Sequence, residues 1–385
     1  MAKTRRTSFV TGAAGFSGSW LIRELLDAGD HVVASDRETS IGEGRHAALL
    51  DVAGVPMEHP RLEWSPADLL DVASLQKALP AHVDRVFHVA SLYDYSAPIE
   101  RLREINVEGT RHLLAALRDH TLQRFVHWST CGVFGKPYTA ADGSQVNVPF
   151  TESSSSPRTA PSSERGPEGT HLVNAYSISK WEQERMIWEA ARDGLPVNVV
   201  RPAPIYGPGS DYGHGGIALA IAHGLLPVIP ADSKNYITAS VHVRDIARFA
   251  VHVADRDDLI GEDYNIVDNS IISYREFLHY IALLCGRRIR DIPLVRMRHL
   301  RHLVLGAAHA ANYLERRWGM PRPQMLEVQS ATYMASSYWL SNRKSMDTGF
   351  EYMYPDVREG LKDTVTWMRE QGWLTDGDRL KHTAK

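Results

Sequence analysis

Short apolar runs and longer amphipathic segments alternate along the first 130 residues of the chain. The short runs predict strands at 8–10, 31–35, 61–65, 85–90 and 125–129, and the segments with three- and four-residue apolar spacing predict helices at 17–26, 72–79 and 99–117. A helix at 175–192 and a strand at 197–200 continue the pattern. This alternation predicts an α/β fold, with a Rossmann-type doubly wound parallel sheet.

The pattern becomes irregular and helix-rich beyond residue 203, with helices predicted at 274–285, 296–316 and 357–371. We expect a smaller, mostly helical C-terminal domain on the carboxyl edge of the sheet, where open α/β sheets bind ligands. The expected boundaries are 1–202, with a contribution from 237–268, for the sheet domain, and 203–236 with 269–375 for the second domain. Residues 376–385 are expected to form a tail.

The segment 153–169 interrupts the pattern, because it is rich in Ser, Pro and Gly and nearly lacks apolar residues. Such a composition predicts a flexible inserted loop. It is either a solvated insertion or a lid that orders over bound substrate, and the sequence leaves both interpretations open.

Composition and charge narrow the function classes. The 385 residues are 43% hydrophobic and 23% charged, as in ordinary globular proteins. A net charge of −3 gives no reason to expect nucleic-acid binding.

Two cysteines, Cys131 and Cys285, cannot form a disulfide framework, and no apolar signal-like stretch opens the chain. A cytoplasmic enzyme is therefore expected. The histidines show no zinc-type spacing, so no metal site is expected.

A glycine-rich motif, TGAAGFSG, follows the first strand and opens the first helix. Glycines at 12, 15 and 18 would let a dinucleotide pyrophosphate approach the helix N-terminus. Asp36 ends the second strand, where a carboxylate accepts hydrogen bonds from the adenosine ribose and repels a 2′-phosphate. This favours NAD as the cofactor, whereas Arg37 could pair with the phosphate of NADP, which is the less favoured choice.

A second motif pairs Tyr176 with Lys180, which lie one helical turn apart on one face of the helix predicted at 175–192. An ammonium near a phenol stabilises the phenolate, so Tyr176 could exchange a proton with a substrate hydroxyl. Ser129 and Thr130 end the fifth strand, and a hydroxyl there could hold the reacting oxygen of an alcohol or ketone.

Together these features resemble the extended short-chain dehydrogenase/reductase family, also called the NAD-dependent epimerase/dehydratase family. The resemblance also rests on HVAS at 88–91, NVEGT around Asn106, RPAPIYGPG at 201–209 and HVRD at 242–245. It implies catalytic roles for Thr130, Tyr176 and Lys180. The implied cofactor-binding residues are Gly12, Ala14, Gly15, Phe16, Ser17, Gly18, Asp36, Arg37, Asp68, Leu69, Val89, Ala90, Ser91, Asn106, Ser129, Tyr176, Lys180, Pro202 and Ile205. Since 46 positions separate Thr130 from Tyr176, more than in the family pattern, the loop at 153–169 is interpreted as an insertion.

The branch of the family is indicated by what the chain lacks. Dehydratases of the family carry an Asp-Glu pair after the catalytic Thr, where this chain has Cys131 and Gly132. Sugar-nucleotide epimerases carry an Asn and an Arg where this chain has Pro204 and Thr238. The chain resembles instead the 3β-hydroxysteroid dehydrogenase-like branch, and the resemblance rests on HVASLYDYSAP at 88–98, RPAPIYGPG at 201–209, SSYWLSNRKS at 336–345 and the apolar stretch at 300–314.

The resemblance implies an NAD(P)-dependent oxidoreductase that interconverts a secondary alcohol and a ketone on a mainly apolar, sterol-like or lipid-like substrate. The alternative is an NAD-dependent sugar-nucleotide epimerase. The expected substrate contacts are Tyr93, Tyr95, Thr130, Cys131, Gly132 and Ala203. The resemblance also implies a homodimer formed through the helices at 99–117 and 175–192.

An apolar stretch at 300–314 is interrupted by polar residues and cannot span a bilayer. We favour a packed core helix there over an apolar substrate entrance or a peripheral membrane contact.

Overall fold

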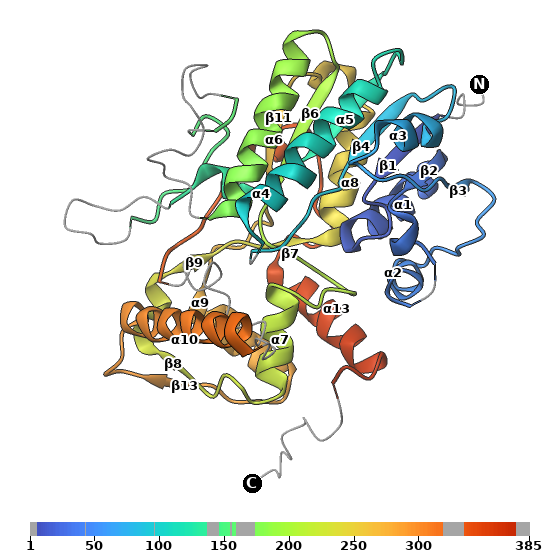
Figure 1. The fold of residues 1–385 in the computed structure, drawn as a ribbon. Coiled ribbons are helices and arrows are strands. Elements are labelled where there is room, and N and C mark those ends of the chain that lie inside the picture. Colours follow the sequence, from blue (N-terminus) through green and yellow to red (C-terminus); the bar gives the residue numbers. More distant parts are fainter. Residues whose placement is uncertain are drawn as a thin grey trace.

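The computed structural model describes residues 6–42, 44–95, 97–136, 146–154, 156–158, 174–318 and 335–374. Its framework is a parallel sheet in the strand order β11-β6-β5-β4-β1-β2-β3 (Figure 1). The strands are β1 Thr7–Thr11, β2 His31–Ser35, β3 Leu62–Trp64, β4 Arg85–His88, β5 Arg124–Trp128, β6 Val197–Pro202 and β11 Asp263–Ile266. The order reverses between β1 and β4, and such a reversal opens a ligand crevice at the carboxyl ends of the strands.

Helices cover both faces of this sheet. On one face α1 packs against α8 and α2, and on the other α3 packs against α5, while α6 packs against α4 and the π-helical turn that follows it. Their bounds are α1 Phe16–Asp27, α2 Arg45–Ala53, α3 Val72–Ala78, α4 Ile99–Leu102, α5 Gly109–Ala116, α6 Ala175–Arg192 and α8 Val243–Ala254. Neighbouring strand residues point into opposite cores, as Phe9 and Val10 of β1 do. The Rossmann-type fold predicted from the alternating pattern is thus confirmed.

A second group of elements lies below the sheet in Figure 1 and has its own core of buried side chains, such as Phe277, Ile281 and Leu361. Its helices are α7 His214–Ala222, α9 Tyr274–Leu284, α10 Met297–Trp318 and α13 Val357–Glu370, whereas α12 Arg343–Asp347 packs against β11 at the edge of the sheet. Three short strand pairs accompany these helices: β7 Ile205–Tyr206 with β10 Val241–His242, β9 Ile237–Thr238 with β12 Ile272–Ser273, and β8 Val228–Pro230 with β13 Arg290–Ile292.

The predicted helix at 99–117 is one continuous run, but its middle is a π-helical turn at Arg103–Glu108 between α4 and α5. Three elements of the sheet half have no counterpart in the sequence pattern, namely α2, α8 and β11. The strand β11 is hidden because two of its four residues are polar. Asp263 is ion-paired and Asn265 donates to the carbonyl of Phe150, so both can be buried.

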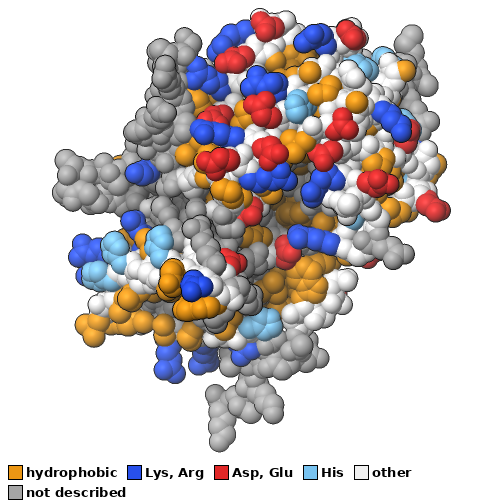
Figure 2. All heavy atoms as spheres, viewed as in Figure 1, with side chains coloured by type: hydrophobic (Ala, Val, Ile, Leu, Met, Phe, Trp, Pro, Cys, Tyr) orange, Lys and Arg blue, Asp and Glu red, His pale blue; other side chains and the backbone are white. Residues whose placement is uncertain are grey.

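The expectation of a packed core helix over 300–314 is wrong. Most side chains of α10 are exposed, including Leu303 at 69%, Tyr313 at 62% and Trp318 at 61%. Figure 2 shows hydrophobic, cationic and histidine side chains together over this helix. The physical reason is that α10 packs through only a narrow stripe, to which Met297 and Ala308 belong.

The expectation of a solvated loop fails at the beginning of the segment 153–169. Ser156 is fully buried, and the guanidinium of Arg158 pairs with Asp263 and Glu262. Charged partners on β11 and just before it draw these residues onto the sheet edge. Residues 155 and 159–169 of the expected loop, and the expected tail at 376–385, lie outside the described residues.

Candidate active site

A cavity of about 630 Å³ opens at the carboxyl edge of β1, β2, β4, β5 and β6. It brings together most of the residues singled out in the sequence. Those that line it are Gly12, Gly15, Phe16, Ser17, Gly18, Asp36, Arg37, Asp68, Leu69, Val89, Ala90, Ser91, Tyr93, Tyr95, Ser129, Thr130, Cys131, Tyr176, Lys180, Pro202, Ala203 and Ile205. Ala14, Asn106 and Gly132 do not line it.

The glycine motif forms one end of the cavity. A Cβ on Gly18 would lie 2.2 Å from the carbonyl oxygen of Gly12, and a Cβ on Gly12 would lie 2.6 Å from the backbone nitrogen of Ala90. Helix α1 begins after Gly15, and no side chain caps its N-terminus. Backbone N–H groups at the positive end of a helix are a binding site for a phosphate group. Gly12, Gly15 and Gly18, called the glycine cradle below, therefore fit the pyrophosphate of a dinucleotide.

Asp36 lies beside this cradle, directly after β2. Its carboxylate accepts hydrogen bonds from the backbone N–H groups of Ala14 at 3.1 Å and Arg37 at 2.8 Å. Ala14 thus acts through its backbone as a support for Asp36. Arg37 and Arg45 line the same end of the cavity, and Arg45 pairs with Asp211 across it at 3.0 Å. This end contains both an acceptor for a ribose and cations near it.

Asp68 and Leu69 line the next part of the wall. The Asp68 carboxylate caps its own turn by accepting from the N–H of Leu70 at 2.9 Å. The carbonyl oxygen of Leu69 lies 2.9 Å from Nδ1 of His112. Gly109 allows α5 to approach Leu69 closely, because a Cβ on Gly109 would lie 2.9 Å from the Cβ of Leu69. The wall is therefore fixed against α5.

Asn106 is fully buried in the π-helical turn behind the cavity wall. Its side-chain oxygen accepts from the N–H of Leu92 at 2.7 Å, and its amide nitrogen donates to Ser179 Oγ at 3.0 Å. Asn106 thereby ties the cavity-lining segment after β4 to helix α6. Its position supports an indirect role instead of direct contact with a cofactor.

Helix α6 carries the Tyr-Lys pair into the cavity. Asn174 caps the helix by accepting from the N–H of Ser177 at 2.8 Å. Lys180 is buried, and its Nζ donates to the carbonyl of Trp128 at 2.8 Å and to Oε1 of Gln183 at 2.5 Å. Burial lowers the pKa of the Lys180 amine to about 7, and nearby Glu184 opposes this shift. The amine is thus held rigidly and can change its charge near neutral pH.

A buried polar chain extends from Lys180 to the end of β1. Gln183 donates to Thr110 Oγ1 at 2.8 Å, and Thr110 lies 2.8 Å from Nε2 of His88. Nδ1 of His88 lies 2.8 Å from Thr11 Oγ1. Burial, reinforced by the charge of Lys180, lowers the pKa of His88 to about 3. His88 therefore stays neutral at the working pH, as a fixed hydrogen-bonding group.

The turn after β5 faces α6 from the other side. Thr130 Oγ1 accepts the N–H of Gly132 at 3.2 Å, and Thr130 lines the cavity. Gly132 lies behind the wall, where a Cβ would lie 2.7 Å from Ser177 Oγ, so it serves close packing against α6. Burial raises the pKa of the Cys131 thiol to about 12, which argues against a thiolate nucleophile.

Four tyrosine rings surround this region. The rings of Tyr93 and Tyr95 lie with their centroids 5.0 and 5.3 Å from that of Tyr176, in edge-to-face contact. Tyr212, at the start of the second group of elements, lies 5.1 Å from Tyr93. Such a cluster presents apolar ring surface with polar tips.

Tyr212 and Arg45 line the cavity and were missed by the sequence reasoning. Tyr212 follows the RPAPIYGPG motif by three residues, so extending that motif could have found it. Arg45 begins a helix that the sequence pattern does not indicate, and no local signal marks it.

A parallel sheet with a glycine cradle, a carboxylate directly after β2 and a Tyr-Lys pair defines a dinucleotide-dependent enzyme of the extended short-chain dehydrogenase/reductase type. Residues 8–267 match the NAD dependent epimerase/dehydratase family, and the chain belongs to it.

Curated relatives cover nearly the whole chain. Cinnamoyl-CoA reductase 1 of Oryza sativa subsp. japonica is 29% identical, covering 95% of this chain and 91% of the relative. The 3-beta-hydroxysteroid dehydrogenase of Mycolicibacterium neoaurum is 23% identical, covering 90% and 87%. This similarity agrees with the branch indicated by the sequence.

A solved structure supports the fold. That of DesIV, a dTDP-glucose 4,6-dehydratase from Streptomyces venezuelae with NAD bound, is similar with a TM-score of 0.67. It is 24% identical, and the match covers 95% of this chain and 98% of that one. Among the described residues, none of the helices is long and apolar enough to cross a membrane.

Proposed function

We propose that this enzyme transfers a hydride between NAD and a mainly apolar secondary alcohol or ketone, sterol-like or lipid-like in character. One observation carries the proposal: a single cavity joins the glycine cradle to Thr130, Tyr176 and Lys180, and its far end is lined by tyrosine rings. The name of the steroid dehydrogenase relative supports the substrate class.

NAD would supply the hydride acceptor or donor at its nicotinamide. The residues proposed to hold it are the glycine cradle, Asp36 at the ribose, Asp68 and Leu69 near the adenine, and Pro202 and Ile205 near the nicotinamide. Asp36 favours NAD over NADP, since a 2′-phosphate would lie against a carboxylate.

The chain's own residues would handle the proton. In the oxidative direction the phenolate oxygen of Tyr176 accepts the substrate's hydroxyl proton and becomes a neutral phenol, while Thr130 holds the substrate oxygen by a hydrogen bond. Two N–H groups of protonated Lys180 are directed at Trp128 and Gln183, and the third is available to a ribose hydroxyl. The ammonium also favours the phenolate of Tyr176. In the reductive direction Tyr176 returns the proton.

The tyrosine rings support an apolar substrate. Tyr93, Tyr95 and Tyr212 offer flat apolar surface near Tyr176, and the cations Arg37, Arg45 and Arg101 also line the cavity. We propose that residues 1–202 with 237–268 bind the nucleotide and that 203–236 with 269–375 complete the substrate side.

We further propose that α10 makes a peripheral membrane contact through which apolar substrates reach the enzyme. Its exposed Leu303, Tyr313 and Trp318 lie on a helix whose exposed residues also include Arg298 and His302. Apolar side chains beside cations are the features with which a helix lies in an anionic lipid interface.

The experiment that tests the function follows NADH absorbance with sterols, long-chain 3-hydroxy acids and UDP-sugars as substrates. We expect turnover with the apolar alcohols and exchange of NAD in each cycle. An epimerase would return the hydride to the sugar without a net change in NADH, so the UDP-sugars are also assayed for conversion to their epimers. Conversion of UDP-sugars alone, with NAD retained through purification, would favour the epimerase alternative.

A further inference from the structure

The turn that carries Thr130 is held on both sides by residues outside the cavity. On one side Ser129 Oγ donates to Glu184 at 2.5 Å. On the other side the hydroxyl of Tyr338 donates to the carbonyl oxygen of Cys131 at 2.6 Å. Glu184 and Tyr338 do not line the cavity. The two neighbours of Thr130 are therefore held from behind, Ser129 through its side chain and Cys131 through its carbonyl.

Tyr338 is itself held in a defined position. It is buried, and its backbone N–H donates to the carbonyl of Ile237 at 3.1 Å. Its ring lies 5.4 Å from that of Phe150, which in turn stacks on Phe134 at 5.2 Å. The N–H of Phe150 donates to the carbonyl of Trp339 at 2.8 Å. The backbone of Phe150 thus joins those of Trp339 and Ser341.

Glu184 is held by charge. Its carboxylate is fully buried and accepts from the guanidinium of Arg201 at 2.6 Å. Arg201 also pairs with Asp263 at 2.5 Å. Asp263 and Glu262 in turn receive two cations from outside the sheet. These are Arg158 and Lys344, which follow Phe150 and Ser341 in the chain.

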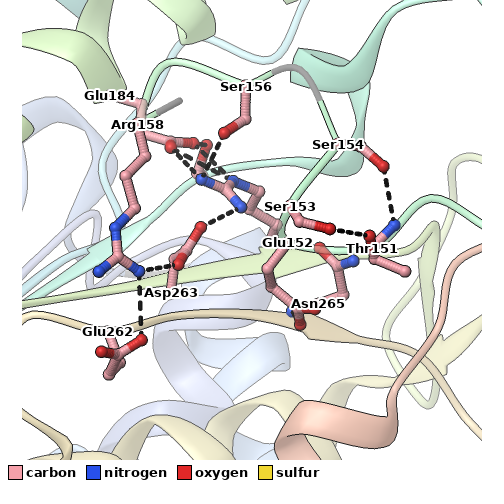
Figure 3. Close-up of polar contacts among 12 residues, drawn as sticks. Thr151, Glu152, Ser153, Ser154, Ser156, Arg158, Glu184, Glu262, Asp263 and Asn265 are labelled. Carbon is pink, nitrogen blue, oxygen red and sulfur yellow. Dashed lines mark hydrogen bonds and ion pairs between the residues drawn. The ribbon is translucent and has the colours of Figure 1, made fainter. Parts of the chain in front are cut away.

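Figure 3 shows Arg158 among these carboxylates. Three acids, Glu184, Asp263 and Glu262, face three bases, Arg201, Arg158 and Lys344. A fourth carboxyl, that of Glu152, interacts with Lys344 and Asp263, and burial raises its pKa. A buried carboxylate keeps its position only when it is paired and hydrogen-bonded. The inserted segment thereby contributes to holding Glu184.

We propose that Tyr338 and Glu184 are positioning residues for Thr130, and that residues 150–154 and 156–158, together with 335–344, form a brace behind the turn that carries Thr130. This inference rests on the proposed role of Thr130. A hydroxyl that holds a reacting oxygen must be placed accurately, since small displacements slow catalysis strongly. The first described residues of the insertion before Tyr176, 153–154 and 156–158, would thus help to hold the turn that carries Thr130.

Cys131 is a built-in reporter of the turn, because the chain has only one other cysteine, Cys285, which is buried elsewhere. The variant Tyr338→Phe removes one hydroxyl and keeps the ring. Iodoacetamide should then label Cys131 about tenfold faster than in the unmodified enzyme, since the carbonyl loses its partner. Labelling of Cys285, followed by mass spectrometry, should stay the same.

The matched control is Tyr352→Phe, which removes a tyrosine hydroxyl that lies 3.0 Å from Ser345 Oγ, away from the cavity. It should leave the labelling of both cysteines unchanged. Equal Cys131 labelling in Tyr338→Phe and the unmodified enzyme would overturn the proposed brace. In Arg158→Met, an unchanged Cys131 rate would overturn the part assigned to residues 150–154 and 156–158.

Catalysis gives the second readout. With a substrate from the panel above, Tyr338→Phe should lower kcat about tenfold while KM and the Kd for NAD change less than twofold. Faster labelling of Cys131 with an unchanged kcat would refute the positioning role. If the unmodified enzyme turned over no member of the panel, the proposed function would fail, whereas the labelling would still decide whether Tyr338 holds the turn.

Discussion

Replacing the buried lysine should change how stability depends on pH. The pKa of Lys180 is lowered by burial from 10.5 to about 7. Between these two values the unfolded chain binds more protons than the folded protein does, so the free energy of unfolding rises with pH in this window. Below pH 7 both states are protonated, and the pH no longer changes this contribution.

The slope approaches about 1.4 kcal/mol per pH unit, and the rise between pH 7 and pH 9 amounts to about 2 kcal/mol. The variant Lys180→Met lacks the titrating amine. The difference in unfolding free energy between the unmodified protein and the variant should therefore grow by about 2 kcal/mol over that interval. Other titrating groups are common to both proteins, so their contributions cancel in the difference.

Urea unfolding of the cofactor-free protein at pH 6, 7, 8 and 9 measures this difference. The control is Lys77→Met, because Lys77 is exposed on α3. Its difference from the unmodified protein should not vary with pH. A Lys180→Met difference that is equally constant from pH 6 to pH 9 would show that burial does not lower the pKa of Lys180.

Three further outcomes can be measured. Gly18→Ala should weaken NAD binding at least about tenfold, measured by calorimetry, because the new Cβ meets backbone atoms. The control Gly306→Ala, in open space on α10, should leave NAD binding unchanged. An NAD affinity of Gly18→Ala equal to that of the unmodified enzyme would contradict the glycine cradle. Asp36→Asn should raise the ratio of NADP to NAD affinity about tenfold, and an unchanged ratio would remove Asp36 from the ribose site. Leu303→Asp should reduce co-sedimentation with anionic lipid vesicles severalfold, while the control Leu225→Asp, at another exposed leucine, should not. If the unmodified protein did not bind the vesicles, the proposed membrane contact of α10 would be refuted.

The sequence predicted the sheet half well, because its signal is periodic and local. The helix at Ala175–Arg192 has the predicted bounds, and the six predicted strands agree with β1 to β6 to within two residues at each end. The strand β11 carries no such signal, since Asp263 is buried only because partners distant in sequence neutralise it.

The residues of the candidate site likewise differ in whether the sequence alone predicts them. Residues in compact motifs, such as Gly18, Tyr176 and Lys180, were predicted because their spacing carries their chemistry. Tyr338 could not be predicted, since 207 positions separate it from Cys131 and only the fold brings them together. The exposure of α10 could not be predicted from the sequence either, because its apolar residues are compatible both with packing in a core and with a lipid contact.

The account depends most directly on Tyr176 as the proton-exchanging group. Turnover of NADH by Tyr176→Phe, with the substrate preferred by the unmodified enzyme, tests it in one measurement. We predict a loss of at least about a hundredfold in kcat, with NAD affinity unchanged within twofold, because the phenolic hydroxyl is removed and the ring is kept. A kcat equal to that of the unmodified enzyme would contradict the proposed mechanism.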